Sequence, residues 1–183
     1  MEYAVSGKSE MVIGLISDTH LLSGSTLPTQ IDTIFRDVDL ILHAGDIYNS
    51  SVLDRLEQIA PALATEGDED LFQEIDDRVQ HEHILLFGGL NLWLIHKIPL
   101  HFLQLLASGA DAELLDSIGR VCATTPDVIV FGDTHRALVQ NVKGILFVNP
   151  GSPTVPNHLS GPGTVALLTI SSGRTETRIV QLR

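Results

Sequence analysis

The first third of the chain alternates short, uninterrupted apolar runs with segments that carry apolar residues at helical spacing. Residues 11–17, 39–43 and 62–65 are typical of strands buried on both faces of a sheet. Between these runs, a segment that opens at Pro28 and residues 51–60 each place apolar residues on one helical face. This β-α-β-α-β order predicts an α/β fold with a parallel sheet and helices packed on it.

The second half of the chain predicts further strands and one long helical region. Two apolar runs flank Gly88-Gly89, which indicates a hairpin, and residues 100–122 are mostly helical with a break near Ser108-Gly109. The strands expected here are 83–87, 90–96, 128–131, 137–142, 145–148, 164–170 and 177–182. The pattern favours one mixed sheet or two packed sheets with outer helices. Residues 11–183 are expected to form a single domain, and residues 1–10 a flexible extension.

Composition and charge narrow the classes of partner. The 183 residues are 44% hydrophobic and 19% charged, an ordinary globular balance, and the formal net charge is −12. A surface this acidic repels nucleic acid and anionic lipid, so we expect neither as a partner. A phosphate-bearing substrate would need a local source of positive charge, and a bound metal ion is one such source.

Cysteine usage and targeting signals favour a cytoplasmic protein. The single cysteine, Cys122, excludes an intrachain disulfide and falls on an apolar helical stripe, which indicates a buried thiol. No apolar run approaches the ~20 residues of a membrane helix, and residues 1–10 lack the apolar stretch of a signal peptide.

Side chains of metal-binding type follow the apolar strands at their C-terminal ends. The candidates are Asp18, His20, Asp46, Asp68, His96, Asp133 and His135. In open α/β sheets, ligands bind in the crevice beyond the carboxyl ends of the strands. Glycine immediately precedes Asp46, Asp68 and Asp133, and a residue without Cβ permits the bends and close approaches of a crowded site. We therefore expect these side chains to meet around bound cations.

The order of these motifs resembles the calcineurin-like metallophosphoesterase superfamily, specifically its small bacterial and archaeal phosphodiesterase branch. The family motifs run D-x-H, G-D, G-N-x-D, H-G and G-H-x-H. The matching segments are Asp18-Thr19-His20, Gly45-Asp46, Gly67-Asp68-Glu69-Asp70, His96-Lys97, Gly132-Asp133-Thr134-His135 and the branch-like run Asn149-Pro150-Gly151-Ser152. The resemblance covers nearly the whole chain from Met11 onward. It implies a four-layer αββα sandwich of two mixed β-sheets flanked by helices.

The resemblance also implies a two-metal site. The first ion would take Asp18, His20, Asp46 and His135. The second would take Asp18, Asp46, Asp68, His96 and Asp133, so Asp18 and Asp46 would be shared. Two divalent ions ~3.5–4 Å apart can activate a bridging water and neutralise charge on a phosphoryl group, and hydroxide then attacks phosphorus in line.

The activity that follows is metal-dependent hydrolysis of a small phosphate ester, either a diester or a monoester. By the same resemblance, Asp46, Asp70 and His135 are the expected catalytic residues. The expected cofactors are one or two divalent ions per chain, Mn first, with Fe, Mg, Ni and Zn as alternatives. Relatives in this branch often self-associate, so a homodimer is a further expectation.

Three positions depart from the family pattern: Asp68 replaces Asn, Asp133 replaces His, and Lys97 replaces Gly. The two new carboxylates bring the ionised ligands to four, enough to balance two divalent ions before any substrate arrives. We expect a strong first site and a weakened or altered second one. The Lys97 ammonium could lie among Asp68 and Asp133 and partly replace the second metal, and the added oxygen ligands favour Mn, Mg or Fe.

Several alternatives stay open at this point. Asp68 could belong to a solvated acidic turn, and Asp133 could only orient His135. His43 is expected to give a supporting hydrogen bond. Glu69 stands where larger phosphatases of the superfamily have a histidine, which leaves the proton donor for the leaving group unassigned. The remaining histidines are His81, His83 and His101, expected at the surface or as caps, and His158, which could approach substrate.

Two other functions compete with the enzyme. The superfamily includes a trafficking subunit, the retromer component, that resembles this branch and serves mainly as a binding surface, so a non-catalytic scaffold is possible. A metal-binding regulatory protein without hydrolysis lies between the two.

Overall fold

Three parallel strands form the centre of one sheet and end at a common edge. The computed structural model describes residues 9–22, 25–70, 76–156 and 161–182. β1 (Glu10–Ile16), β2 (Leu40–His43) and β3 (Ala62–Thr65) pair in parallel, with α1 (Gln30–Ile34) and α2 (Ser51–Glu57) in the connections. The register places His43 beside Ile16 and Ala64, so the three strands finish together. The predicted β-α-β-α-β unit is confirmed.

The same sheet is extended on both sides, in the order β11-β10-β1-β2-β3-β4. β10 (Thr164–Ser171) runs antiparallel to β1, and β11 (Arg174–Gln181) forms the outer edge. β11 begins three residues before the predicted strand, because its first three residues are polar and carry no apolar signal. β4 (Val79–Gln80) was not predicted, since two residues are too few to show a period.

The second sheet has the order β5-β6-β7-β9-β8 and contains the predicted Gly88-Gly89 hairpin. The helical region divides at Gly109, whose φ of 71° ends the first helix, as predicted. The elements of this half are β5 (Glu82–Phe87), β6 (Leu90–Ile95), α3 (Leu100–Ser108), α4 (Asp111–Val121), β7 (Val128–Val130), β8 (Leu138–Val142) and β9 (Ile145–Asn149).

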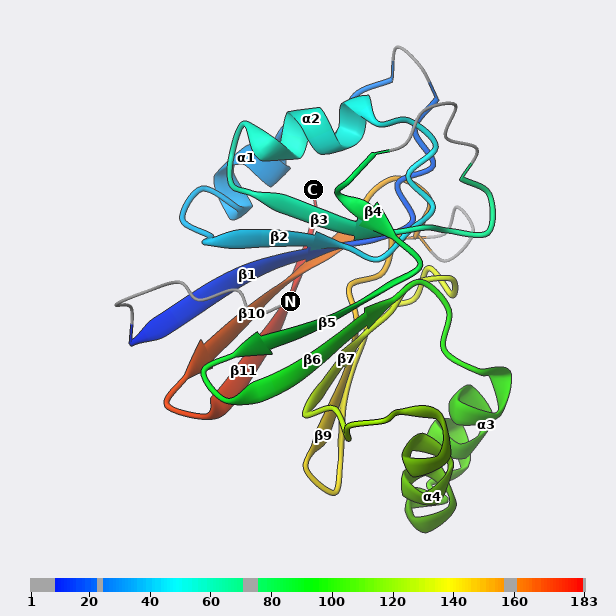
Figure 1. Ribbon diagram of the computed structural model, residues 1–183. Coiled ribbons are helices and arrows are strands. Elements are labelled where there is room, and N and C mark those ends of the chain that lie inside the picture. Colours follow the sequence, from blue (N-terminus) through cyan, green and yellow to red (C-terminus); the bar gives the residue numbers. More distant parts are fainter. Residues whose placement is uncertain (1–8, 23–24, 71–75, 157–160, 183) are drawn as a thin grey trace.

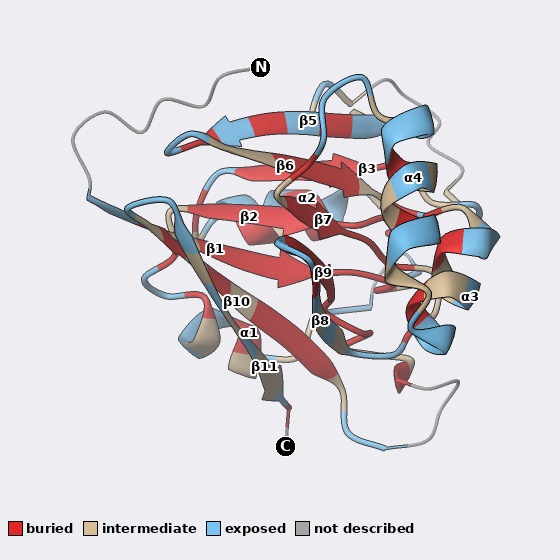
Figure 2. Ribbon diagram, turned by 90° about the horizontal axis from the view of Figure 1, so that it is seen from below, coloured by how far each residue is buried: buried red, intermediate tan, exposed pale blue. Residues whose placement is uncertain are grey.

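The two sheets and their helices make four layers with an apolar cluster at each of the three interfaces. The central cluster lies between the sheets and includes Leu15, Leu42 and Val130. A second cluster packs α1 and α2 on the first sheet, and a third packs α3 and α4 on the second sheet (Figure 1). The strands are therefore mostly buried while the outer faces of the helices are exposed (Figure 2). The expected αββα sandwich is confirmed.

Two expectations made from the sequence need adjustment. Glu10, the last residue of the predicted extension, already belongs to β1 and pairs with Ser171, whereas residues 1–8 lie outside the described part of the chain. The prediction that His83 lies at the surface or caps an element is wrong. His83 is buried on the inward face of β5, and its Nε2 lies 2.8 Å from the Ala64 carbonyl oxygen. Within the described residues, no helix is long and apolar enough to cross a membrane.

Candidate metal centre

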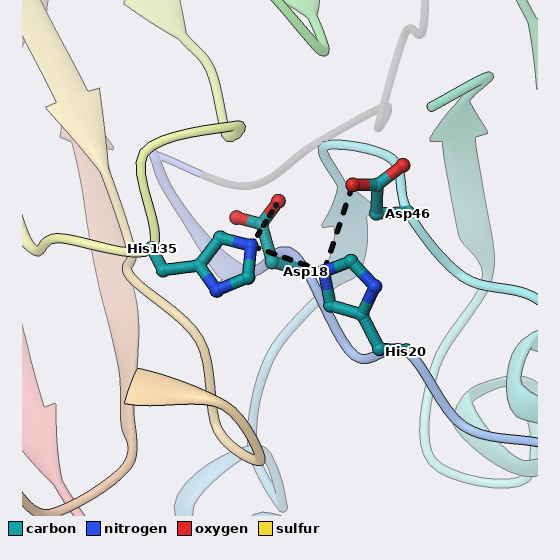
Figure 3. Close-up of side chains that lie close together, drawn as sticks. All are labelled: Asp18, His20, Asp46 and His135. Carbon is teal, nitrogen blue, oxygen red and sulfur yellow. Dashed lines mark hydrogen bonds and ion pairs between the residues drawn. The ribbon is translucent and has the colours of Figure 1, made fainter. Parts of the chain in front are cut away.

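The seven predicted ligands converge beyond the C-terminal ends of the strands, in two neighbouring groups. Within each group the donor atoms lie within 4.8 Å of one another. The first group contains Asp18, His20, Asp46 and His135, and Figure 3 shows their side chains directed toward a common point. The second group contains Asp68, His96 and Asp133. Residues up to 117 positions apart in sequence, Asp18 and His135, therefore share one site, as the strand-end pattern predicted.

Asp46 connects the two groups. Its Oδ2 lies 3.6 Å from His20 Nε2 and 3.6 Å from His96 Nε2. Asp18, the other residue predicted to be shared, stands in the first group, with Oδ1 3.8 Å from His135 Nε2. Asp18 Oδ1 also accepts a hydrogen bond at 3.1 Å from the backbone N–H of Asp133, which belongs to the second group. The sharing of Asp18 between two ions stays a prediction.

The histidine rings are oriented by backbone carbonyls. Nδ1–H of His96 donates to the Ala44 oxygen at 2.7 Å, and Nδ1–H of His135 donates to the Val155 oxygen at 2.9 Å. Each bond leaves Nε2 directed into the site, and a carbonyl that accepts from the other ring nitrogen is a common way to orient a metal-binding histidine.

Two features of these rings fit a bound cation. His20 Nε2 and His135 Nε2 face each other at 3.0 Å, so at least one imidazole lone pair points into the space that the carboxylates share. His96 Nε2 is buried and has no hydrogen-bond partner among the described residues. A buried polar atom without a partner is costly, and a metal ion held by these donors would relieve that cost.

The ligand loops adopt an unusual backbone conformation. Eight described non-glycine residues have positive φ, and most of them are at this site. The predicted ligands among them are Asp18 (52°), His20 (44°), Asp46 (55°), Asp133 (65°) and His135 (55°). Left-handed conformations in non-glycine residues cost free energy and cluster at functional sites, so this concentration supports a functional role.

Two of the predicted glycines are required by close approach. Gly45 has a φ of 86°, and a Cβ placed there would lie 2.6 Å from His96 Nδ1. A Cβ on Gly132 would meet the Ser17 hydroxyl and lie 2.7 Å from the Ala44 carbonyl oxygen. These positions keep the ligand loops of the two sheets in contact.

Burial sets the electrostatics of the first group. Desolvation raises the pKa of the Asp18 carboxyl to about 6, although the hydrogen bond from the Ser17 hydroxyl partly opposes the shift. Burial also lowers the pKa of His20 and brings that of His43 to about 3. His43 Nε2 lies 3.1 Å from Thr19 Oγ1, the supporting contact that the sequence predicted. Without a cation, ionisation of the Asp18 carboxyl therefore costs more free energy than ionisation of an exposed carboxyl.

Lys97 occupies the outer side of the second group. Its Nζ lies 2.7 Å from Asp68 Oδ2 and 3.0 Å from Asp133 Oδ1, the arrangement expected from the sequence. Hydrogen bonds to Asp68 and then to Asp133 raise the pKa of the Lys97 ammonium, and the bond from Lys97 lowers the pKa of Asp68. Lys97 therefore stays cationic between these two carboxylates.

Asp70 and Glu69 lie outside both groups. The Asp70 carboxylate accepts hydrogen bonds from the backbone N–H groups of Ile47 and Tyr48 at 2.7 Å and of Gly67 at 2.8 Å. Asp70 therefore positions the loop that carries Asp46, and its direct catalytic role stays a prediction. Glu69 Oε2 lies 3.6 Å from His20 Nδ1 and accepts a hydrogen bond from the Tyr48 hydroxyl.

Sequence reasoning did not assign roles to the residues that brace these loops. The Ser152 hydroxyl donates to the Asp18 carbonyl at 2.7 Å, and the Thr154 hydroxyl donates to the Thr19 carbonyl at 2.6 Å. The only signal was the resemblance of the Asn149-Pro150-Gly151-Ser152 run to the family branch. Tyr48 was also missed. His158 lies outside the described residues.

Asn149→Ala is expected to lower the free energy of unfolding by about 2–3 kcal/mol, because it leaves buried backbone groups unpaired. The buried Asn149 amide donates to the Gly132 carbonyl at 2.7 Å and accepts from the Gly151 N–H at 2.8 Å. Urea denaturation measures the change. Asn141→Ala, at an exposed position near the end of β8, is the matched control and should cost less than about 1 kcal/mol. Equal costs for the two variants would contradict the bracing role.

Comparisons with known proteins agree with this geometry. Residues 11–173 match the family model described as the calcineurin-like phosphoesterase superfamily domain. A probable metallophosphoesterase of Methanothermobacter thermautotrophicus is 32% identical over 172 residues, covering 93% of this chain and 92% of the relative. A probable metallophosphoesterase of Methanocaldococcus jannaschii is 33% identical over 147 residues, covering 80% of this chain and 70% of the relative. The structure of vacuolar protein sorting 29 from Cryptosporidium parvum has the same fold, with a TM-score of 0.69 and 18% identity. The match covers 94% of this chain and 98% of that protein.

Proposed function

This chain belongs to the calcineurin-like phosphoesterase superfamily, and from that membership and the geometry of its site we propose that it hydrolyses small phosphate esters with bound divalent metal ions. The observation that carries the proposal is the first group. Two carboxylates and two imidazoles, drawn from three separate loops, bring their donor atoms within 4.8 Å of one another in a largely buried position. Such a set suits a first-row divalent ion.

Some residues of the site would bind the ions, and others hold the ligand side chains in position. Asp18, His20, Asp46 and His135 would bind the first ion, and His96 with Asp68 and Asp133 would bind the second beside Asp46. Bound ions would supply an activated water and positive charge for the phosphoryl group. Asp70, Ser152 and the backbone carbonyls of Ala44 and Val155 keep the donors in place.

The environment of Glu69 bears on the choice of substrate. Its side chain is 60% exposed, and it accepts the hydrogen bond from the Tyr48 hydroxyl, so it serves there as an acceptor and not as a proton donor. Esters whose leaving group departs without protonation should therefore react best. The oxygen-rich second group favours Mn among the candidate ions.

The test is metal-dependent turnover of bis-p-nitrophenyl phosphate and p-nitrophenyl phosphate. Protein stripped with chelator should be inactive and should regain activity with Mn, and less with Ni, Mg or Fe. His135→Gln should lose most of this activity because it removes a donor of the first group, whereas His81→Gln, at an exposed position outside both groups, should behave as wild type. Folded protein without turnover under any of these metals would reject the proposal.

A non-catalytic, metal-binding scaffold is the second candidate. One observation favours it. The Lys97 ammonium contacts Asp68 and Asp133, so positive charge from the protein itself is already present at the second group. Metal binding that raises the melting temperature without any turnover would support the scaffold over the enzyme.

A further inference from the structure

The second group is in contact with a cation that belongs to the protein itself. Lys97 Nζ reaches Asp68 and Asp133, two of the three donors whose atoms lie within 4.8 Å of one another. An ammonium that bridges both carboxylates uses the oxygen atoms that a metal ion between them would need as ligands. Lysine and a metal ion therefore compete for the same donors.

The ammonium satisfies only the outer part of this group. His96 is 3% exposed, its Nδ1–H is committed to the Ala44 carbonyl, and its buried Nε2 has no hydrogen-bond partner among the described residues. The single positive charge of Lys97 thus offsets only one of the two carboxylate charges, and the buried imidazole nitrogen stays unsatisfied. A divalent ion held by Asp68, His96 and Asp133 would satisfy all three. The group consequently has two alternative occupants.

We propose that Lys97 is a tethered competitor that occupies the second group until a metal ion displaces it, so that the two groups fill in order and with unequal affinity. Among the described residues, no lysine forms an ion pair with Asp18 or Asp46, so the first group fills first. This inference rests on the part of the proposed function that assigns metal ions to the two groups, and it does not depend on hydrolysis.

The solvent exposure of the Lys97 ion pairs shows whether Lys97 competes with a metal ion or replaces it permanently. The Lys97 and Asp68 side chains are 53% and 59% exposed, and Asp133 is 28% exposed. Ion pairs this open to water are weak, because solvent stabilises the separated charges. Two such pairs lower the affinity for an incoming divalent ion by about tenfold, which is too little to exclude it. The released ammonium remains beside the filled site.

Titration of chelator-stripped protein with Mn(II), followed by calorimetry and by the electron paramagnetic resonance signal of free Mn(II), tests the inference. Wild type should bind one equivalent tightly and a second about tenfold or more weakly. Lys97→Met should tighten the second equivalent about tenfold and leave the first unchanged. Lys97→Arg, which keeps the cation, should resemble wild type. Lys143→Met, the same change in the exposed turn between β8 and β9, is the matched control and should also resemble wild type.

The outcomes separate this inference from the proposed function. Two bound ions whose affinities do not change in Lys97→Met would overturn the competition alone. A wild type that binds both ions with equal affinity would do the same. Failure of both proteins to bind any Mn(II) would overturn the assignment of metals to these groups, and the competition with it.

Discussion

Asp46→Asn should reduce metal-stimulated hydrolysis about a thousandfold, because it removes a carboxylate that faces both groups of donors. Asp46 Oδ2 is 3.6 Å from His20 Nε2 and from His96 Nε2, so its charge serves both positions. Asparagine has nearly the same size and tolerates the φ of 55° at this position. The change therefore removes charge and donor strength without reshaping the loop.

The measurement is kcat/KM for bis-p-nitrophenyl phosphate with saturating Mn, together with the urea midpoint as a check on folding. Asp116→Asn is the matched control, since Asp116 is exposed on α4 and pairs with Arg120. The control should retain wild-type activity. A folded Asp46→Asn protein within tenfold of wild type would show that the two groups do not act together.

Asp18→Asn should stabilise the metal-free protein at pH 8 by about 2 kcal/mol in free energy of unfolding while abolishing its stabilisation by metal. Burial raises the pKa of the Asp18 carboxyl from 3.8 to about 6, so at pH 8 the folded protein holds a buried, ionised carboxylate at a cost. An amide removes that charge. The Ser17 hydroxyl, 3.2 Å from the Ala44 carbonyl oxygen, can donate there and accept from the new amide.

The pH dependence of this effect has a definite sign. A raised carboxyl pKa means that the folded state binds its proton more readily than the unfolded state. Wild type should therefore gain stability relative to the variant as pH falls from about 6 toward 3.8, and the difference between the proteins should shrink.

Urea unfolding with chelator at pH 8 and pH 5 measures this change. With metal at a hundred times its dissociation constant, wild type should gain about 2.7 kcal/mol that the variant lacks. A metal-free variant less stable than wild type at pH 8 would contradict the electrostatic account.

The central strands and the approximate place of the ligands follow from the sequence. β1, β2, β3 and β7 are continuous apolar runs because both of their faces are covered. Each polar residue directly after such a run must lie at the edge of the sheet, so the convergence of Asp18, Asp46 and Asp133 could be anticipated. The contacts of Lys97 with Asp68 and Asp133 could be anticipated from the opposite charges of these side chains.

Other features depend on contacts that no local pattern carries. The pairing of β1 with β10 joins Met11 to Ile170, and no local rule sets that register. The bracing by Asn149 and Ser152 uses backbone carbonyls, which every residue has, so the sequence does not show which ones accept. His83 is different: the inward alternation of β5, shared with Leu85 and Phe87, would have revealed its burial.

The positive φ angles of the ligand loops restrict how this site can change by mutation. Asp, Asn and His are the non-glycine residues that enter the left-handed region most readily, and their side chains also offer oxygen or nitrogen to metals. At Asp133, with φ of 65°, aspartate and the histidine of the family motif are both compatible with one loop shape. Interchange of these three residue types can therefore retune charge and metal preference while the scaffold stays the same, whereas β-branched replacements are blocked by the backbone itself.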